Sequence, residues 1–316
     1  MKRLFGFLFS LTFAASAAWA DYPDKPISLI VPLPAGGPTD AVARSVADAL
    51  SKSLGKPIVV ENKPGADGAI GAKAAMAAPA DGYTLLFGIG SLVAIPYLQN
   101  PPPYDAQKDL NPVSAIGRFP FVLSVHPSVP AATLSEFIAY AKSKPGGLFY
   151  ASSTASEALA AAEFMKATGV VMTRVPYKGA GQAMPDLLSG RVHVMFGPIS
   201  AVLPASKEGK LRLLAMFSSS RTPAAPDVPT LSEAGVAGIA VPTWQAVFAP
   251  PGVPKPVIDR LNAEIAAALG TDGLRTRLDG LMLQIEPSTP EELRERIAQE
   301  SRTWEQFIRD HKLGPQ

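Results

Sequence analysis

The chain has 316 residues and no cysteine, and its 29 lysines and arginines against 27 aspartates and glutamates give a formal net charge of +2 at pH 7. Disulfide and thiolate chemistry are therefore excluded, and the balanced charge argues against nucleic acid as a partner, because nucleic-acid binding requires a strongly basic surface. A chain of this length can bury a large core and more often forms two domains than one.

The first twenty residues have the layout of a secretory signal peptide. Lys2 and Arg3 give a basic start, residues 4–15 are mostly apolar, and Ala18-Trp19-Ala20 is a small-x-small cleavage site. A membrane anchor is the weaker interpretation, because the apolar run is short for a bilayer span. We expect cleavage after Ala20, and a mature protein that is soluble, monomeric and located in the periplasm.

Strand and helix patterns alternate from residue 27 onward. Residues 27–33 predict a buried strand, and residues 40–54 place Val42, Val46 and Leu50 on one helical face that ends at Gly55. Residues 58–61, 69–77 and 83–89 predict a further strand, helix and strand. This order is typical of a parallel or mixed sheet covered by helices.

A second series of the same kind follows an extended segment at residues 121–126. Thr133 and Glu136 predict a capping box for a helix through residue 142, and Thr289 and Glu292 predict another at the start of a helix over residues 290–311. The remaining expected strands are 148–152, 171–177, 192–196, 211–217 and 241–249, and the remaining helices are 156–168, 182–188, 256–269 and 273–281.

Two α/β series joined by two extended crossings predict two domains with a ligand cleft between them. After the signal peptide (residues 1–20), we expect residues 21–122 to begin domain 1 and residues 123–240 to form domain 2. Residues 241–316 then return to domain 1.

Residues 32–40 connect a strand to a helix and include Gly36, Gly37, Thr39 and Asp40. Glycines let the backbone approach a ligand closely, and the free amides of a helix start attract anions. Capping of the helix by Thr39 or Asp40 alone explains the segment equally well. Its position at a strand's carboxyl end favours ligand binding.

Three more segments lie at equivalent strand ends. They contain Ser91 after Gly90, the hydroxyl run Ser152-Ser153-Thr154, and Tyr177 with Gly179 in residues 176–181. Each segment alone is a weak signal, since small hydroxyl residues before a helix are usually caps. Together they predict a site shared by both domains.

Features of an enzyme are missing. His126, His193 and His311 are far apart in the sequence and outside any metal-binding pattern, and the S-x-x-K match at Ser53 and Lys56 lies at a helix end, where it occurs by chance. We expect no catalysis, no metal and no cofactor. Trp244, on the second crossing, either lines the cleft or has a structural role at the hinge.

The sequence resembles the Bug family of periplasmic receptors, the substrate-binding proteins of tripartite tricarboxylate transporters. Seven segments carry the resemblance: YPDKPI at 22–27, PAGGPTD at 34–40, VENKPGA at 60–66, PADGYTLL at 79–86, YASS at 150–153, VPYKG at 175–179 and APDVPT at 225–230. The resemblance covers essentially the whole mature chain.

It implies a type II two-domain binding protein whose cleft holds a carboxylate through loop backbone groups and ordered waters. It also implies permease subunits of such a transporter as membrane partners. Carried over, Gly36, Gly37, Thr39 and Ser91 lie on one side of the cleft. Ser152, Ser153, Thr154, Tyr177 and Gly179 face them.

Two positions depart from the family pattern. Residues 154–157 replace a Gly-Asn-Gly-Ser-like run, and Gly197 stands where many members carry Asp. Because Gly197 offers only its backbone carbonyl, and because we expect Glu157 to face outward from a first helical turn, the cleft should prefer an organic acid without an amino group. Phe196, Pro198 and Trp244 would supply its apolar wall.

The leading functional hypothesis is thus a receptor for carboxylate uptake. A receptor that reports the same ligand to a membrane signalling protein is a close alternative. A periplasmic hydrolase is a remote one, since no histidine lies in any candidate loop to act as a base.

Overall fold

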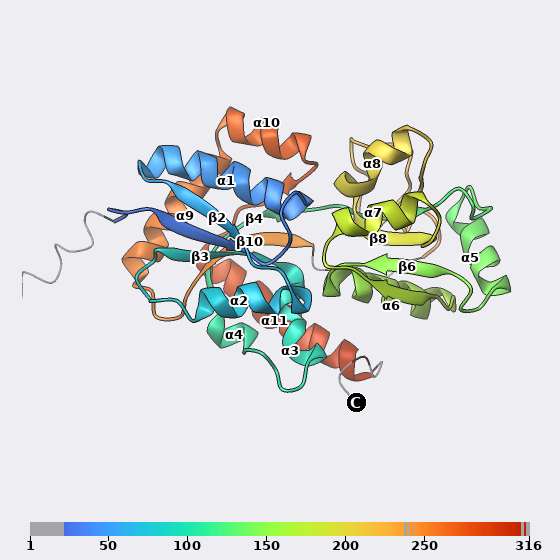
Figure 1. Cartoon of the computed structure of the whole chain (residues 1–316), viewed down its shortest axis with the longest axis horizontal. Coiled ribbons are helices and arrows are strands. Elements are labelled where there is room, and N and C mark those ends of the chain that lie inside the picture. Colours follow the sequence, from blue (N-terminus) through green and yellow to red (C-terminus); the bar gives the residue numbers. More distant parts are fainter. Residues whose placement is uncertain (1–21, 237–238, 240, 242, 311–312, 314–316) are drawn as a thin grey trace, which may run out of the picture.

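A computed structural model of the chain describes residues 22–236, 239, 241, 243–310 and 313. The expected signal peptide, its cleavage site and His311 lie outside the described residues. Within them, two separate β-sheets lie toward opposite ends of the long axis, each covered by helices (Figure 1).

The first sheet has six strands in the order β11-β4-β10-β3-β1-β2. β1 pairs in parallel with β2 and β3, whereas β10 pairs antiparallel with β3 and β4. A late strand is therefore inserted between two early ones, which ties distant parts of the chain together. The bounds are β1 (Ile27–Val31), β2 (Ile58–Asn62), β3 (Thr84–Ile89), β4 (Asn111–Arg118), β10 (Trp244–Ala249) and β11 (Gln284–Ile285).

The second sheet has five strands in the order β7-β6-β8-β5-β9. β6 pairs in parallel with β7 and β8, and β5 pairs antiparallel with β8 and β9. The first crossing between the sheets is short, since β4 ends at Arg118 and β5 begins at Phe121. The bounds are β5 (Phe121–Val125), β6 (Phe149–Ser152), β7 (Thr173–Pro176), β8 (Val194–Pro198) and β9 (Arg212–Met216).

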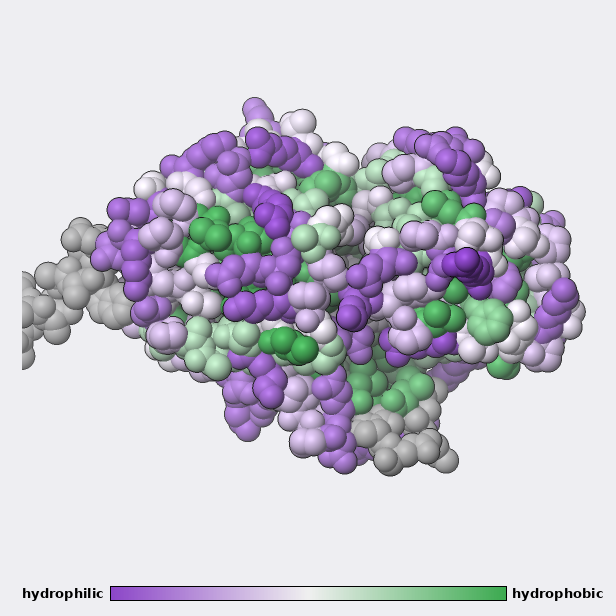
Figure 2. Space-filling model, viewed as in Figure 1, coloured by the Kyte–Doolittle hydropathy of each residue, from purple (hydrophilic) through white to green (hydrophobic). Residues whose placement is uncertain are grey.

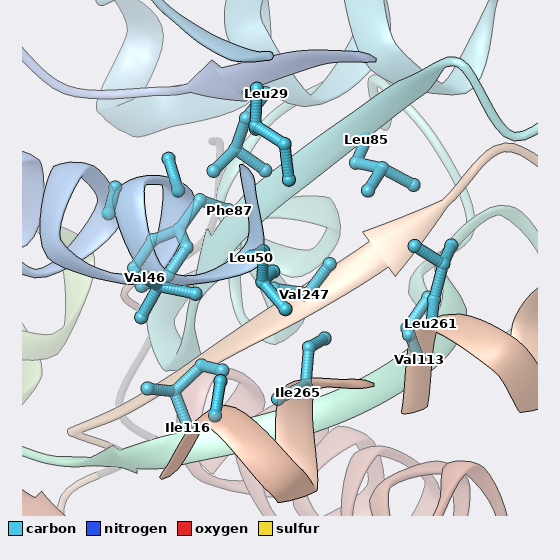
Figure 3. Packing of buried hydrophobic residues seen from close by; sticks show 14 of the residues in the cluster. Leu29, Val46, Leu50, Leu85, Phe87, Val113, Ile116, Val247, Leu261 and Ile265 are labelled. Atoms are coloured by element: carbon cyan, nitrogen blue, oxygen red, sulfur yellow. The ribbon is translucent and has the colours of Figure 1, made fainter. Parts of the chain in front are cut away.

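Alternating side chains bury both faces of the first sheet. Leu29 and Val31 belong to one apolar cluster and Ile30 to another, as the period of two in a strand requires. Figure 3 shows Leu29, Val46, Leu50, Phe87 and Ile265 filling the space between this sheet and its helices. The first cluster includes α1 (Pro38–Leu54), α9 (Lys255–Leu269) and α10 (Asp272–Gly280). The second includes α2 (Ala69–Met76), η2 (Gly90–Val93), α3 (Ile95–Leu98), α4 (Ala106–Asp109) and α11 (Pro290–Asp310). The short helix η1 (Ala66–Gly68) precedes α2.

The second sheet is covered in the same way. Leu123 and Phe196 pack with α5 (Leu134–Ser143) and α6 (Ala155–Thr168), and Val122 and Met195 pack with α7 (Ala180–Leu188) and α8 (Ile199–Lys207). Each lobe therefore has a core on both faces of its own sheet.

Several elements differ from the sequence prediction. The strands β4 and β11 and the helices α3, α4 and α8 were not predicted; Pro112 and Gly117 interrupt the periodic pattern in β4, and Pro204 interrupts it in α8. The expected strand over 171–177 is shorter, spanning only β7. Both capping boxes are confirmed, since Thr133 and Glu136, like Thr289 and Glu292, hydrogen bond reciprocally. None of the helices described here is long and apolar enough to span a membrane.

Candidate functional site

A cavity of about 330 Å³ lies between the two sheets. Its position matches the boundary between the lobes, where the space-filling view shows an indentation at the upper edge (Figure 2). Both sheets contribute to its wall. The lining residues are 33–40, 89–90, 119, 121, 153–154, 156–157, 179–182, 198 and 243–245.

The loop before α1 forms one wall and is held in place by Asp40. Its Oδ2 accepts hydrogen bonds from the Gly36 amide (2.9 Å) and Arg44 Nε (2.9 Å), and Oδ1 accepts one from Asn62 Nδ2 (2.9 Å). Burial opposes ionisation of this carboxyl, but the three hydrogen bonds lower the pKa of Asp40 below its ordinary value. Asp40 thus positions the loop, with both of its oxygens already occupied.

The helices α1 and α7 both begin at a glycine that faces the cavity. Neither Gly37 nor Gly179 can cap its helix with a side chain, and Pro38 begins the first turn of α1. Amides in the first turns, such as that of Thr39, therefore have no side-chain cap, and helix starts of this kind attract anions. A Cβ on Gly179 would lie 3.2 Å from Pro34 Cδ, so the two loops touch across the cleft.

The hydroxyl run before α6 is only partly in the cavity wall. Ser153 and Thr154 line it, whereas Ser152 does not, and its Oγ accepts a hydrogen bond from Arg174 Nε at 3.1 Å. Thr154 is the N-cap of α6 and accepts from the Glu157 amide at 3.3 Å.

Glu157 corrects an expectation. It was expected to face outward, but its side chain is buried (2% exposed) and lines the cavity. The helix α6 packs against both its own sheet and η2 of the other lobe, and residues 155–157 at its start are all buried. Burial raises the pKa of Glu157 from 4.5 to about 7, although hydrogen bonds from Ser153 oppose this shift.

Gly197 does not line the cavity, although its neighbour Pro198 does. A Cβ at Gly197 would lie 3.6 Å from Glu157 Oε1, so the absence of a side chain leaves room for the Glu157 carboxyl. The expected preference for a ligand without an amino group depended on there being no carboxyl beside Gly197. The Glu157 carboxyl lies there, so that expectation loses its basis. Phe196 is also outside the cavity wall, because it is fully buried among Tyr150, Phe164 and other core residues.

Two other predicted residues lie away from the cavity wall. Ser91 is fully buried behind Gly90, and its Oγ has no hydrogen-bond partner among the described residues. Tyr177 donates its hydroxyl hydrogen to Asp186 Oδ2 at 2.8 Å instead. The structure thus brings Gly36, Gly37, Thr39, Asp40, Ser153, Thr154 and Gly179 together in the cavity wall, but not Ser91, Ser152, Tyr177 or Gly197.

The second crossing contributes two residues, Trp244 and Gln245, to the cavity wall. Trp244 lines the cavity, and its indole Nε1 donates to both Glu300 oxygens on α11 (3.0 and 2.9 Å); a structural role at the hinge stays a prediction. Gln245 also lines the cavity, yet no signal pointed to it beyond its place next to Trp244. Phe119 and Phe121, on either side of the first crossing, add apolar surface.

Comparisons with known proteins agree with this architecture. The family model for the tripartite tricarboxylate transporter family receptor matches residues 42–313. Protein BugT of Bordetella pertussis is 37% identical over 308 residues, covering 96% of this chain and 94% of that protein. An R. palustris protein solved with adipate has 34% identity and a TM-score of 0.88, covering 93% of this chain and 100% of that chain. MatC from Rhodopseudomonas palustris, solved with bound malate, has 33% identity and a TM-score of 0.83, covering 91% and 100%.

These similarities extend along both lobes and include the cleft. The family consists of solute-binding receptors, not enzymes, and the related structures are two-domain periplasmic binding proteins. The chain belongs to the tripartite tricarboxylate transporter receptor family.

Proposed function

We propose that this protein captures a small carboxylate in the cleft between its lobes and delivers it to the membrane permease of a tripartite tricarboxylate transporter. The observation that carries this proposal is that α1 and α7 both begin at a glycine in the wall of the same cavity. No lysine or arginine lines that cavity among the described residues, so an anion would be held by backbone amides and by neutral side chains such as Thr39 and Gln182.

Two relatives support the ligand class. One is solved with adipate and another with malate, and both are carboxylates. The apolar wall formed by Phe119, Phe121, Pro198 and Trp244 suits the carbon skeleton of such a molecule.

We further propose that residues 21–122 with 241–316 form one domain and residues 123–240 the other, since the strands of each sheet follow this division closely. In support of this division, β5, the first strand of the second sheet, begins at Phe121, close to the proposed boundary after residue 122. Closure by rotation about the two crossings would seal the ligand inside. Export with cleavage after Ala20 and a monomeric state complete the proposal.

The test is a thermal-shift screen of mono- and dicarboxylates followed by calorimetry. A ligand that binds only the native state raises the melting temperature, and saturating ligand should also reduce the radius of gyration in solution scattering. Absence of binding by any carboxylate, or a ligand seated within one lobe, would contradict the proposal. Mass spectrometry of the exported protein should show a chain that starts at Asp21.

A further inference from the structure

Glu157 is one of four glutamates whose amide donates to the hydroxyl of the threonine three residues earlier; Thr133, Thr154 and Thr289 each precede a helix, whereas Thr230 precedes a turn. Glu136, Glu233 and Glu292 are the other three, and all of them are exposed and accept a hydrogen bond from their threonine's amide. Hydrogen bonds with Thr230 and Thr289 lower the pKa of Glu233 and Glu292. Of these four glutamates only Glu157 lines the ligand cavity, so capping alone does not explain its position.

The contacts of Glu157 are those of a hydrogen-bond acceptor. The Ser153 amide donates to Oε2 at 2.5 Å and the Ser153 hydroxyl donates to the same oxygen at 2.8 Å. Oε1 lies on the side of Gly197, where a side chain is absent. Ser153 therefore fixes one oxygen as an acceptor, and the start of α6 favours the ionised form.

In the part of the chain that the structure describes, no cation hydrogen bonds to the Glu157 carboxylate. Arg174 on β7 lowers the pKa of Glu157 through its charge, but its Nε donates to Ser152 and its NH2 group lies 4.0 Å from Asp67 Oδ1. Across the cavity, Asp40 is paired with Arg44 at 2.9 Å. A buried carboxylate without a cation in contact is costly, and a ligand group that donates a hydrogen to it would reduce that cost.

Gln245 independently provides a second acceptor in the same wall. It is 4% exposed, and its Nε2 donates to the Trp244 carbonyl at 3.3 Å, which fixes the orientation of the amide. Its Oε1 has no hydrogen-bond partner among the described residues. A buried acceptor left without a donor costs stability unless a ligand or water supplies one.

From this geometry we infer that Glu157, with Gln245, is the specificity-determining residue of the cleft and selects a carboxylate that also carries a hydrogen-bond donor, either a hydroxyl or an ammonium group. This inference rests on the proposed function. The ligand carboxylate lies at the starts of α1 and α7, and the donor group contacts Glu157. The donor supplies the hydrogen bond that a buried acceptor lacks in the free protein. An acid without a donor group leaves that acceptor unsatisfied.

The pH dependence has a definite sign. The donor binds the ionised form of Glu157, whose pKa in the free protein is about 7. As pH falls below about 7, Glu157 takes up a proton that the ligand must displace, so affinity falls by up to about tenfold for each pH unit.

The experiment compares acids on a shared carbon skeleton by calorimetry. Suitable sets are succinate, malate and aspartate; glutarate, 2-hydroxyglutarate and glutamate; and phenylacetate, mandelate and phenylglycine. In the set that binds best, a donor-bearing member should bind at least about tenfold more tightly than its parent acid, which corresponds to about 1.4 kcal/mol. Glu157→Gln keeps an oxygen for Ser153 and should remove that preference together with the pH dependence. Glu136→Gln changes the same capping motif outside the cleft and should alter neither.

Three results would overturn the inference while leaving the proposed function intact. They are tighter binding of the parent acid, an unchanged preference in Glu157→Gln, and tighter binding of parent acids as pH falls below about 7, which would show a protonated Glu157 contacting a second carboxylate. If no carboxylate binds at all, the proposed function fails instead. Should Glu157→Gln not fold, the ligand preference and pH profile of the unaltered protein still decide the question.

Discussion

Replacing Glu300 with glutamine tests the electrostatics of the carboxyl that holds Trp244 against the ligand cavity. Burial raises the pKa of Glu300 from 4.5 to about 7, while hydrogen bonding to Trp244 and the charge of Arg296 oppose the shift. Because the folded state binds this proton more tightly, its contribution to stability is fully present below the ordinary pKa and is lost as pH rises through about 7. Glutamine keeps an oxygen that accepts from the Trp244 indole but has no proton to lose.

The size of the effect follows from the shift. About 1.4 kcal/mol for each pKa unit gives roughly 3 kcal/mol, and partial exposure of Glu300 reduces this to about 2 kcal/mol. We therefore expect Glu300→Gln to gain about 2 kcal/mol relative to the parent protein between about pH 5 and about pH 8.

Urea unfolding of both proteins across this pH range measures the difference in the free energy of unfolding. Glu295→Gln is the matched control, because Glu295 is exposed on the same helix. The difference in the free energy of unfolding between Glu300→Gln and the parent could instead stay constant, or the variant could become relatively less stable as pH rises. Either result would show that burial does not raise the pKa of Glu300.

Three further substitutions test the packing and the helix caps by the same measurement. Gly71→Ala should lower the free energy of unfolding by about 1–3 kcal/mol despite alanine's better helix propensity, because its Cβ would lie 2.7 Å from the Lys63 carbonyl oxygen and 2.8 Å from Pro32 Cα. Gly273→Ala in α10 meets no atom within 4 Å and should instead gain up to about 1 kcal/mol; losses of equal size at both glycines would rule out the clash as the cause. Thr133→Ala should cost about 1 kcal/mol through loss of the capping box at α5, and no loss would mean that water replaces the cap.

Local sequence patterns predict the alternation of strands and helices, the two crossings and the loops that meet at the cleft. These features depend on local chemistry: apolar runs such as residues 27–31 form strands, Thr133 and Glu136 cap a helix within four residues, and Gly55 ends one in the left-handed conformation. Gly36, Gly37 and Gly179 were found for the same reason, because a glycine at a strand-to-helix turn is visible in the sequence.

Which of these loop residues face the cavity depends on packing between segments far apart in the chain. Thr154 and Glu157 have the same spacing as Thr133 and Glu136, yet one glutamate is exposed and the other is buried between the lobes. The difference arises because α6 packs against η2, a short helix of the other lobe. No local pattern encodes a neighbour that is so distant in the sequence. Gln245 enters the cavity wall for a similar reason, since β10 reaches its place only by pairing between β3 and β4.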